Sequence, residues 1–305
     1  MSVEEAIASL GNGAAPMTDT SLAELSGLSP EELALFEQAW AGIGLERRRQ
    51  IVSRLVKLAD DSIELSFDGI FKKRLRDPDA GVRSQAIEGL WECEEPSLIA
   101  PLVSLLEEDT SEIVQTEAAA ALGRFAMLAE QGKLEEDNTA RVRQALLAAI
   151  NDGNKAVEVR CCALESVGPL NFPEVNRAIM ESYRSDDDRL SLSSVCAMGS
   201  SCDPFWLPIL LQELSNANAE MRCAAAAALG ELEEESTVPQ LTELIYDEDA
   251  DVQLAAIQAL GEIGGSEARE CLELCMDDSN ETICQAAERA LEELVDKEGL
   301  QSFHA

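Results

Sequence analysis

Apolar and polar residues follow each other along this chain with the period of an α-helix, and the same helical pattern returns at a fixed distance. Apolar positions recur three and four residues apart, which is typical of helices with one buried face. Each pattern opens on an aliphatic anchor; the anchors are Ile51, Val82, Val114, Val159, Leu190, Met221, Val252 and Ile283. Five intervals between anchors are 31 residues, one is 32, and the interval from 114 to 159 is 45. A fixed period of this length indicates a repeat protein.

Each period predicts two helices. The first runs from the anchor to an Ala-Leu-Gly or related ending, where the Gly is a candidate C-cap because it tolerates positive φ. The second follows a short turn and often has a Pro near its start, where the missing N–H costs little. An Asp-rich turn leads to the next anchor, and Asp caps the helix that follows. The expected fold is all-α, a stack of about seven to eight helix pairs of ~31 residues that forms an α-solenoid.

Three parts of the chain depart from the regular period. Residues 1–28 are rich in Gly, Ser, Thr and acids with weak periodicity, and we expect a disordered acidic tail. Residues 29–45 are expected to be an N-terminal capping helix, with Ser29 as N-cap and Glu32 closing a capping box. Residues 46–305 form the predicted solenoid, with an insertion near 129–138 that accounts for the long interval.

The repeated unit Asp-x-x-Val-Arg-x-x-Ala-x-x-Ala-Leu-Gly resembles the short E-Z type of HEAT repeat, which also occurs in phycobilisome lyases. Residues 79–83, 220–230 and 251–261 carry the likeness, which covers about 45–295. The resemblance implies a right-handed α-α superhelix in which the Arg after the anchor and the turn Asp form a ladder between repeats. That Arg is present at 83, 160 and 222 but is replaced by Gln115, Ser191, Gln253 and Cys284. Other contacts are expected to hold those joints.

Composition narrows the range of partners. Hydrophobic residues make up 46% and aromatic residues 4%, so the core is expected to be aliphatic. The net charge of −36 repels nucleic-acid phosphate and anionic lipid, which excludes both as partners. The chain has no apolar run long enough to span a membrane, and its acidic start lacks the features of a signal peptide. The nine irregularly spaced cysteines favour a reducing compartment, and we predict a cytoplasmic protein.

Catalytic chemistry has little support. The relatives implied by the resemblance include deoxyhypusine hydroxylase, whose iron site needs His-Glu pairs, but this chain has one His, His304. A Ser-His or Cys-His pair is disfavoured for the same reason. Cys161, Cys196 and Cys223 are expected to be small structural residues of the helices. Cys271 and Cys275 could share a ligand on one helix face, although thiolate zinc sites usually have four ligands. We therefore predict no catalytic, cofactor-binding or metal-binding residue.

A basic zone precedes a strongly acidic body. Residues 46–83 carry ten basic and seven acidic side chains, whereas residues 84–305 carry thirteen basic and forty-five acidic ones. The candidates for a patch that binds an acidic partner are Arg47, Arg48, Arg49, Lys72, Lys73 and Arg74. Two alternatives remain open, a contact with the acidic N-terminal segment and an ordinary helix surface.

A column of second-helix residues is the candidate protein-binding groove. Its apolar members are Val103, Leu147, Met180, Leu211 and Thr242, and its polar margin holds Glu107, Glu243 and Tyr246. The resemblance implies that second helices line the concave face; the alternative is that these residues pack between adjacent second helices. We predict a non-enzymatic scaffold that binds a basic or amphipathic partner segment. A bilin lyase-like or cofactor-handling role is the alternative, and the oligomeric state stays open.

Overall fold

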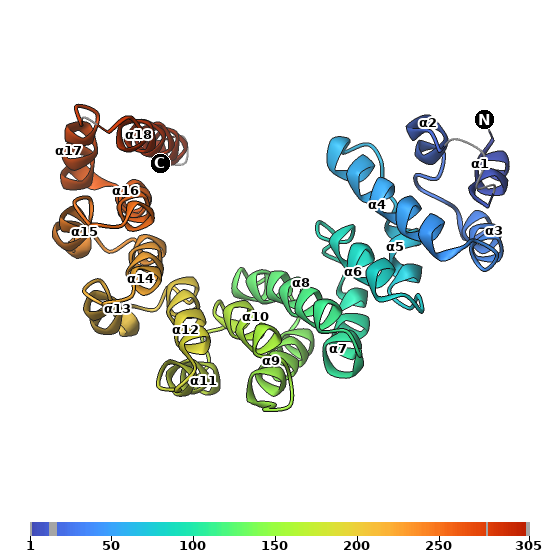
Figure 1. Ribbon diagram of the computed structural model, residues 1–305, viewed down its shortest axis with the longest axis horizontal. Helices are drawn as coiled ribbons and strands as arrows, with labels where there is room; N and C mark the ends of the chain where they lie inside the picture. Colours follow the sequence, from blue (N-terminus) through green and yellow to red (C-terminus); the bar gives the residue numbers. More distant parts are fainter. Residues whose placement is uncertain (1, 12–16, 279, 303–305) are drawn as a thin grey trace. The chain divides into compact units, whose positions relative to one another are not determined.

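The computed structural model describes residues 2–11, 17–278 and 280–302, and this part of the chain is helical with no strand. The all-α prediction is confirmed (Figure 1). The chain divides into two compact units, each considered by itself: unit 1 comprises 1–125 and 134–145, and unit 2 comprises 126–133 and 146–305. Among the described residues, no helix combines the length and the apolar character needed to cross a membrane.

Unit 1 contains the N-terminal helices and the first helix pairs. The anchors Ile51, Val82 and Val114 are fully buried. Val82 and Val114 lie near the start of their helices, and Ile51 lies further along its helix. The helices are α1 (Val3–Leu10), α2 (Asp19–Ala23), α3 (Pro30–Trp40), α4 (Leu45–Asp61), α5 (Asp68–Arg74), α6 (Ala80–Glu88), η1 (Pro96–Leu98), α7 (Ile99–Glu108), and parts of α8 (Glu112–Glu130) and α9 (Glu136–Asn151).

The prediction of a disordered tail is wrong for the described residues of 1–28. Helix α1 packs against α3, and Leu22 and Leu25 are fully buried. Such apolar residues are enough to pack α1 and α2 against the other helices of unit 1. They are too few to produce a clear helical period in the sequence. Of the alternatives left open for the basic zone, a contact with the N-terminal segment is present, because Arg54 Nη2 lies 2.5 Å from Asp19 Oδ1. Residues 1 and 12–16 lie outside the described part.

The capping box predicted at the start of the third helix is present. Ser29 Oγ accepts from the Glu32 N–H, and Glu32 Oε2 accepts from the Ser29 N–H at 2.9 Å. The helix ends at Trp40, and α4 begins at Leu45. The insertion near 129–138 is mainly helical: it lengthens α8 to 19 residues and α9 to 16, and leaves only a short turn at 131–135.

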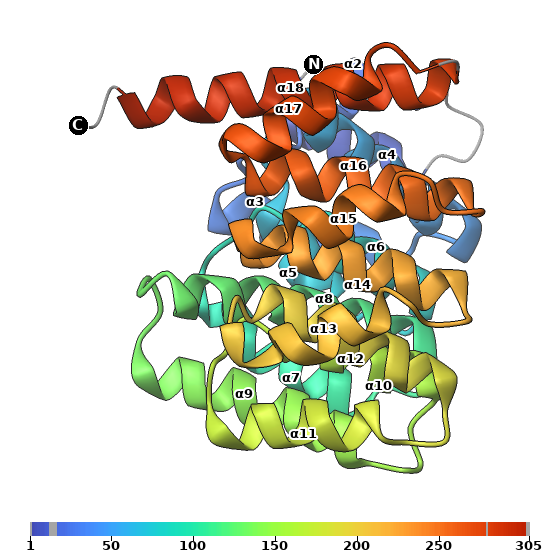
Figure 2. The same ribbon diagram turned by 90° about the vertical axis from the view of Figure 1, so that its left-hand side faces the viewer.

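Unit 2 is built from two rows of helices. The anchor helices are α10 (Val157–Val167), α12 (Asp188–Ser200), α14 (Ala219–Leu232), α16 (Ala250–Ile263) and α18 (Glu281–Ser302). The other row holds α11 (Pro173–Tyr183), η2 (Pro204–Trp206), α13 (Leu207–Glu213), η3 (Glu235–Thr237), α15 (Val238–Leu244) and α17 (Gly265–Cys275). Figure 1 shows the anchor helices on the inside of the curve of unit 2. Figure 2 looks at the outer row, whose helices lie one above another.

Glycine explains why the anchor helices form the inner row. Gly199, Gly230 and Gly261 lie within their helices, so the prediction that they are C-caps is wrong. A Cβ at Gly199 would lie 2.7 Å from the Cα of Ala228, and one at Gly230 would lie 2.8 Å from the Cα of Ala259. Neighbouring anchor helices therefore approach closely, whereas outer helices make few contacts with one another. The closely packed row becomes the shorter side, and unit 2 curves toward it.

The Arg–Asp contacts expected from the resemblance are present at Arg83 and Arg222, whereas Arg160 donates to the carbonyl of Ile150 at 2.9 Å. Arg83 donates two hydrogen bonds of 2.7 Å to Asp109, and Arg222 donates bonds of 2.9 and 2.7 Å to Asp247. Each Arg also donates to a turn carbonyl. The expectation for the other joints is confirmed, because the replacing side chains donate to turn carbonyls: Gln115 to Asp109, Ser191 to Tyr183, Gln253 to Asp247 and Cys284 to Asp278.

Candidate functional site

The inner face of unit 2 is the candidate functional site. Each interior anchor helix contacts an anchor helix on either side and second helices behind it. Its exposed mid-helix positions therefore face the inside of the curve. One such column repeats at the 31-residue period and is exposed throughout: Glu165, Cys196, Ala227, Gln258 and Arg289.

An apolar column lies one helical turn before this exposed column. Its members Cys161, Leu192, Cys223 and Leu254 are half-buried. Residues three, four, seven and eight apart share a helix face, so carboxylates flank this column at both ends of the helices. Glu220 and Asp251 lie toward the helix starts, and Glu231 and Glu262 lie toward the ends. The face thus combines an apolar strip with acidic margins at α14 and α16, whereas Arg189 and Ser200 hold the equivalent positions on α12.

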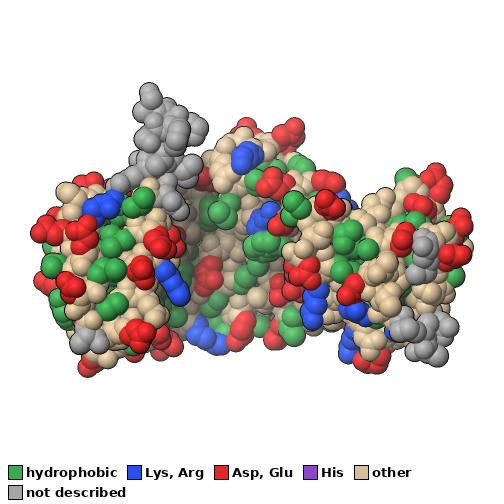
Figure 3. All heavy atoms as spheres, turned by 90° about the horizontal axis from the view of Figure 1, so that it is seen from above, with side chains coloured by type: hydrophobic (Ala, Val, Ile, Leu, Met, Phe, Trp, Pro, Cys, Tyr) green, Lys and Arg blue, Asp and Glu red, His purple; other side chains and the backbone are tan. Residues whose placement is uncertain are grey.

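The electrostatics of this face are those of a concave acidic surface. Burial, followed by the neighbouring Glu262, raises the pKa of Glu231 to about 6. Burial, followed by Glu165 and Glu231, raises the pKa of the Cys196 thiol to about 11. The surface areas of both side chains nevertheless class them as exposed. This combination is expected on an open concave face, where protein surrounds a group without covering it. Acidic side chains are also spread widely over the face seen in Figure 3, with fewer Lys and Arg.

A small cavity of about 310 Å³ lies on the same face between α16 and α18. Leu254 and Ala286 give it apolar walls, and Gln258, Arg289 and Glu293 give it polar ones. Leu254 and Gln258 belong to the two columns described above. The cavity therefore continues the strip to the last helix of unit 2.

The sequence-predicted groove does not lie on the concave face of unit 2. Met180, Leu211 and Thr242 lie on α11, α13 and α15, which form the outer row. The concave assignment is wrong because the small residues that permit close packing belong to the anchor helices. The half-buried members of the predicted set are Val103, Leu147, Met180, Leu211 and Thr242, and the exposed ones are Glu107, Glu243 and Tyr246. Val103 and Glu107 lie on α7 in unit 1.

The six candidate basic residues do not form one open patch. Arg48 and Arg74 pair with Asp77 inside unit 1, and Arg49 pairs with Asp79 at 2.8 Å. Arg47 donates to the carbonyl of Leu10, and Lys72 lies 2.7 Å from Glu95. Only Lys73 is an exposed member of the set without a partner among the described residues.

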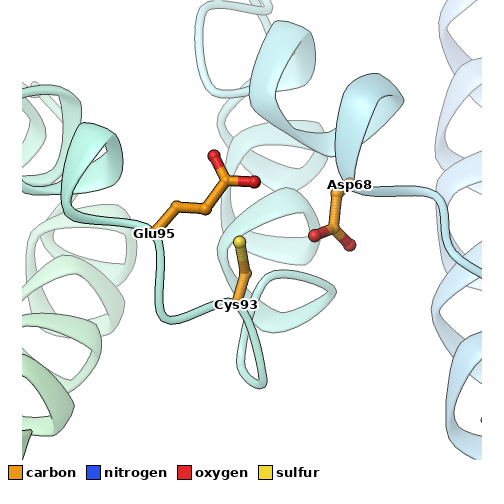
Figure 4. A group of neighbouring side chains, drawn as sticks. All are labelled: Asp68, Cys93 and Glu95. Carbon is orange, nitrogen blue, oxygen red and sulfur yellow. The ribbon is translucent and has the colours of Figure 1, made fainter. Parts of the chain in front are cut away.

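One cluster of potential metal ligands occurs in the described part of the chain. Atoms of Asp68, Cys93 and Glu95 lie within 4.8 Å of one another (Figure 4). The ammonium of Lys72 pairs with Glu95 and interacts with the other two groups. The hydrogen bond to Glu95 and these charges outweigh burial, so the pKa of Lys72 is raised. Lys72 therefore already supplies the cation that balances this cluster.

The thiols of α10, α12 and α14 are less buried than the predicted structural role implies. Cys161 and Cys223 are half-buried and Cys196 is exposed, so all three contribute to the inner face of unit 2. On α17, a hydrogen bond from Cys275 lowers the pKa of Cys271 to about 6. The same bond, together with burial, raises the pKa of Cys275.

Glu231→Gln is expected to stabilise the chain at neutral pH. Because the folded state raises the pKa of Glu231 above its ordinary value of 4.5, stability is lost as the pH rises toward 6. Solvent screening of this exposed group limits the gain in unfolding free energy to about 1 kcal/mol or less. Urea unfolding across this pH range would measure it. A gain that is equally large at pH 4, or an equal gain from Glu220→Gln, would contradict the raised pKa of Glu231.

Comparison with known proteins agrees with the repeat pattern. The family model for HEAT repeats matches residues 69–151 and 207–292. A search of characterised proteins by sequence finds no match. The complex of CpcE and CpcF of phycocyanin lyase from Nostoc sp. is similar in structure, with a TM-score of 0.50 and 17% identity, over 74% of this chain and 94% of that one. Importin beta has a TM-score of 0.53 and 13% identity, over 96% of this chain and 44% of its own. At these identities the likeness concerns the fold alone.

Proposed function

The chain belongs to the HEAT-repeat family, and we propose that it is a protein-interaction scaffold whose unit 2 binds a basic, amphipathic segment of a partner protein. The inner face supports this proposal, with the apolar strip of Cys161, Leu192, Cys223 and Leu254, which carboxylates flank on both sides at α14 and α16. An amphipathic helix binds a groove through apolar anchors spaced along one face. Its Lys and Arg side chains would then reach the carboxylates on either side of the strip.

Charge adds selectivity to this arrangement. The net charge of −36 repels acidic proteins and attracts basic ones, which speeds encounter with a basic segment. A Lys or Arg placed beside Glu231 would favour the ionised carboxylate and lower its raised pKa. Binding is therefore expected to strengthen as the pH rises through about 6, and to weaken as salt is added.

A labelled helical peptide with Leu on one face and Lys on the other is the first probe. By fluorescence anisotropy at low salt, the full chain is expected to bind it on the inner face of unit 2. The double variant Glu231→Lys/Glu262→Lys is expected to weaken binding about tenfold or more, because it reverses one margin of the strip. Glu231→Gln/Glu262→Gln removes the two charges without reversing them and is expected to give a smaller loss of binding. It tests the same margin if the first variant fails to fold.

Outer-row substitutions provide matched controls. Glu243→Lys/Glu270→Lys changes the charge equally but lies on α15 and α17, and is expected to weaken binding much less. Met180→Ser/Leu211→Ser tests the sequence-predicted stripe on the same row. Greater loss in either outer-row variant than in the inner-face variant would overturn the proposal, as would the absence of binding of the Leu/Lys peptide to the wild type.

A further inference from the structure

A second cavity lies in unit 1 and has the opposite charge. Its volume is about 760 Å³, and its lining includes Trp40, Arg48, Lys73, Arg74, Arg76 and Pro101. Pro78 adds exposed apolar surface, whereas Trp40 and Leu75 are almost fully buried. The cavity thus brings together basic residues of α4, α5 and the turn after α5. Five basic and two acidic side chains line this cavity, in a chain of net charge −36.

A buried ion cluster accounts for two of the guanidinium groups. Asp77, whose side chain is 1% exposed, accepts from Trp40 Nε1 at 2.7 Å and from Arg48 Nη1 at 3.0 Å. Arg74 pairs with Glu37 and lies 3.7 Å from Asp77, and its guanidinium stacks over the Trp40 ring at 4.5 Å. The charges of Arg48 and Arg74 are therefore matched by those of Asp77 and Glu37.

Two further cations of this cavity have no such match. Lys73 and Arg76 are exposed, and neither pairs with an acidic side chain among the described residues. In addition, the buried Nε–H groups of Arg48 and Arg74 have no hydrogen-bond acceptor. The cavity therefore has an excess of positive charge and of hydrogen-bond donors, beside an apolar wall.

We propose that this cavity binds an acidic peptide segment of a partner protein, in which carboxylates pair with Lys73 and Arg76 and an apolar side chain contacts Pro78 and Pro101. This inference goes beyond the proposed function, because it assigns a second site of opposite charge in the other unit. A free phosphate fits less well, since the cavity is much larger than one such ion and combines charge with apolar lining. The two cations three residues apart suit successive acidic side chains of a peptide.

The test uses a labelled peptide of Glu and Leu residues, with the full chain at low salt. The wild type is expected to bind it, and Lys73→Glu/Arg76→Glu is expected to weaken binding tenfold or more. Lys73→Gln/Arg76→Gln is expected to give a smaller loss. Lys57→Glu, also exposed on unit 1 but away from this cavity, is the control and is expected to have little effect.

Three outcomes would overturn this inference. The first is the absence of binding to the wild type, and the second is an equal loss in Lys57→Glu. The third is displacement of the peptide by inorganic phosphate as readily as by unlabelled peptide, which would show a simple anion site. Because the Lys-peptide experiment on unit 2 does not involve these residues, this inference and the proposed function can fail separately.

Discussion

Replacing Asp77 by Ala is expected to lower the free energy of unfolding by about 3–5 kcal/mol, the usual cost of removing one partner from a buried ion cluster. Asp77 accepts from Trp40 and Arg48 and lies near Arg74, whose side chain is 4% exposed. Without the carboxylate, two guanidinium charges and the Trp40 N–H lose their shared partner inside unit 1. Urea unfolding followed by circular dichroism would measure this loss.

Two companion variants separate charge from hydrogen bonding at Asp77. Asp77→Asn keeps an acceptor of similar shape and is expected to destabilise less than Asp77→Ala. Asp60→Ala, on the exposed surface of α4, is expected to change stability by less than about 0.5 kcal/mol. If Asp77→Ala has no larger effect than Asp60→Ala, the buried cluster does not hold this part of unit 1 together.

Gly230→Ala is expected to destabilise unit 2 by about 1–3 kcal/mol, because a methyl group would be forced into a closely packed interface. The new Cβ would lie 2.8 Å from the Cα of Ala259, a backbone atom of the neighbouring anchor helix. Relief requires the two helices to move apart, which reduces the curvature of unit 2. Urea unfolding measures the loss, and hydrogen exchange would locate it in α14 and α16.

Gly153→Ala is the matched control for the glycine contact. Gly153 lies in a turn with nothing within 4 Å of a new Cβ. A gain of about 0.4–1 kcal/mol is expected there, because Ala restricts the unfolded chain. If Gly230→Ala is as well tolerated as Gly153→Ala, close packing of the anchor helices does not set the curvature.

The 31-residue period was sufficient to predict the helix pairs and the Asp-rich turns, because both depend on local residue types. The role of Gly230 could not be assigned in this way, since a glycine near a helix end is usually a C-cap. A spacing signal does exist: Gly199, Gly230 and Gly261 each meet an Ala 29 residues later. Only the three-dimensional stacking shows that this spacing brings the two residues into contact.

The candidate site was predicted on the wrong row for a related reason. Both rows carry half-buried apolar residues, such as Met180 on α11 and Leu192 on α12. Which row lies inside depends on how closely each packs, and the Ala run at 224–228 is the sequence feature that favours the anchor row. The basic zone was found correctly, but its pairing with Asp77 and Asp79 depends on the folded contacts.

Binding of a basic segment on the inner face of unit 2 is tested most directly by thiol alkylation with and without the Leu/Lys peptide. Cys161, Cys196 and Cys223 line this face, and Cys93 in unit 1 serves as the internal reference. The peptide is expected to slow alkylation of the three inner-face thiols, as read by mass spectrometry, and to leave Cys93 unchanged. Bound peptide with unchanged rates at all three thiols, or equal protection of Cys93, would contradict the assignment of the inner face as the binding site.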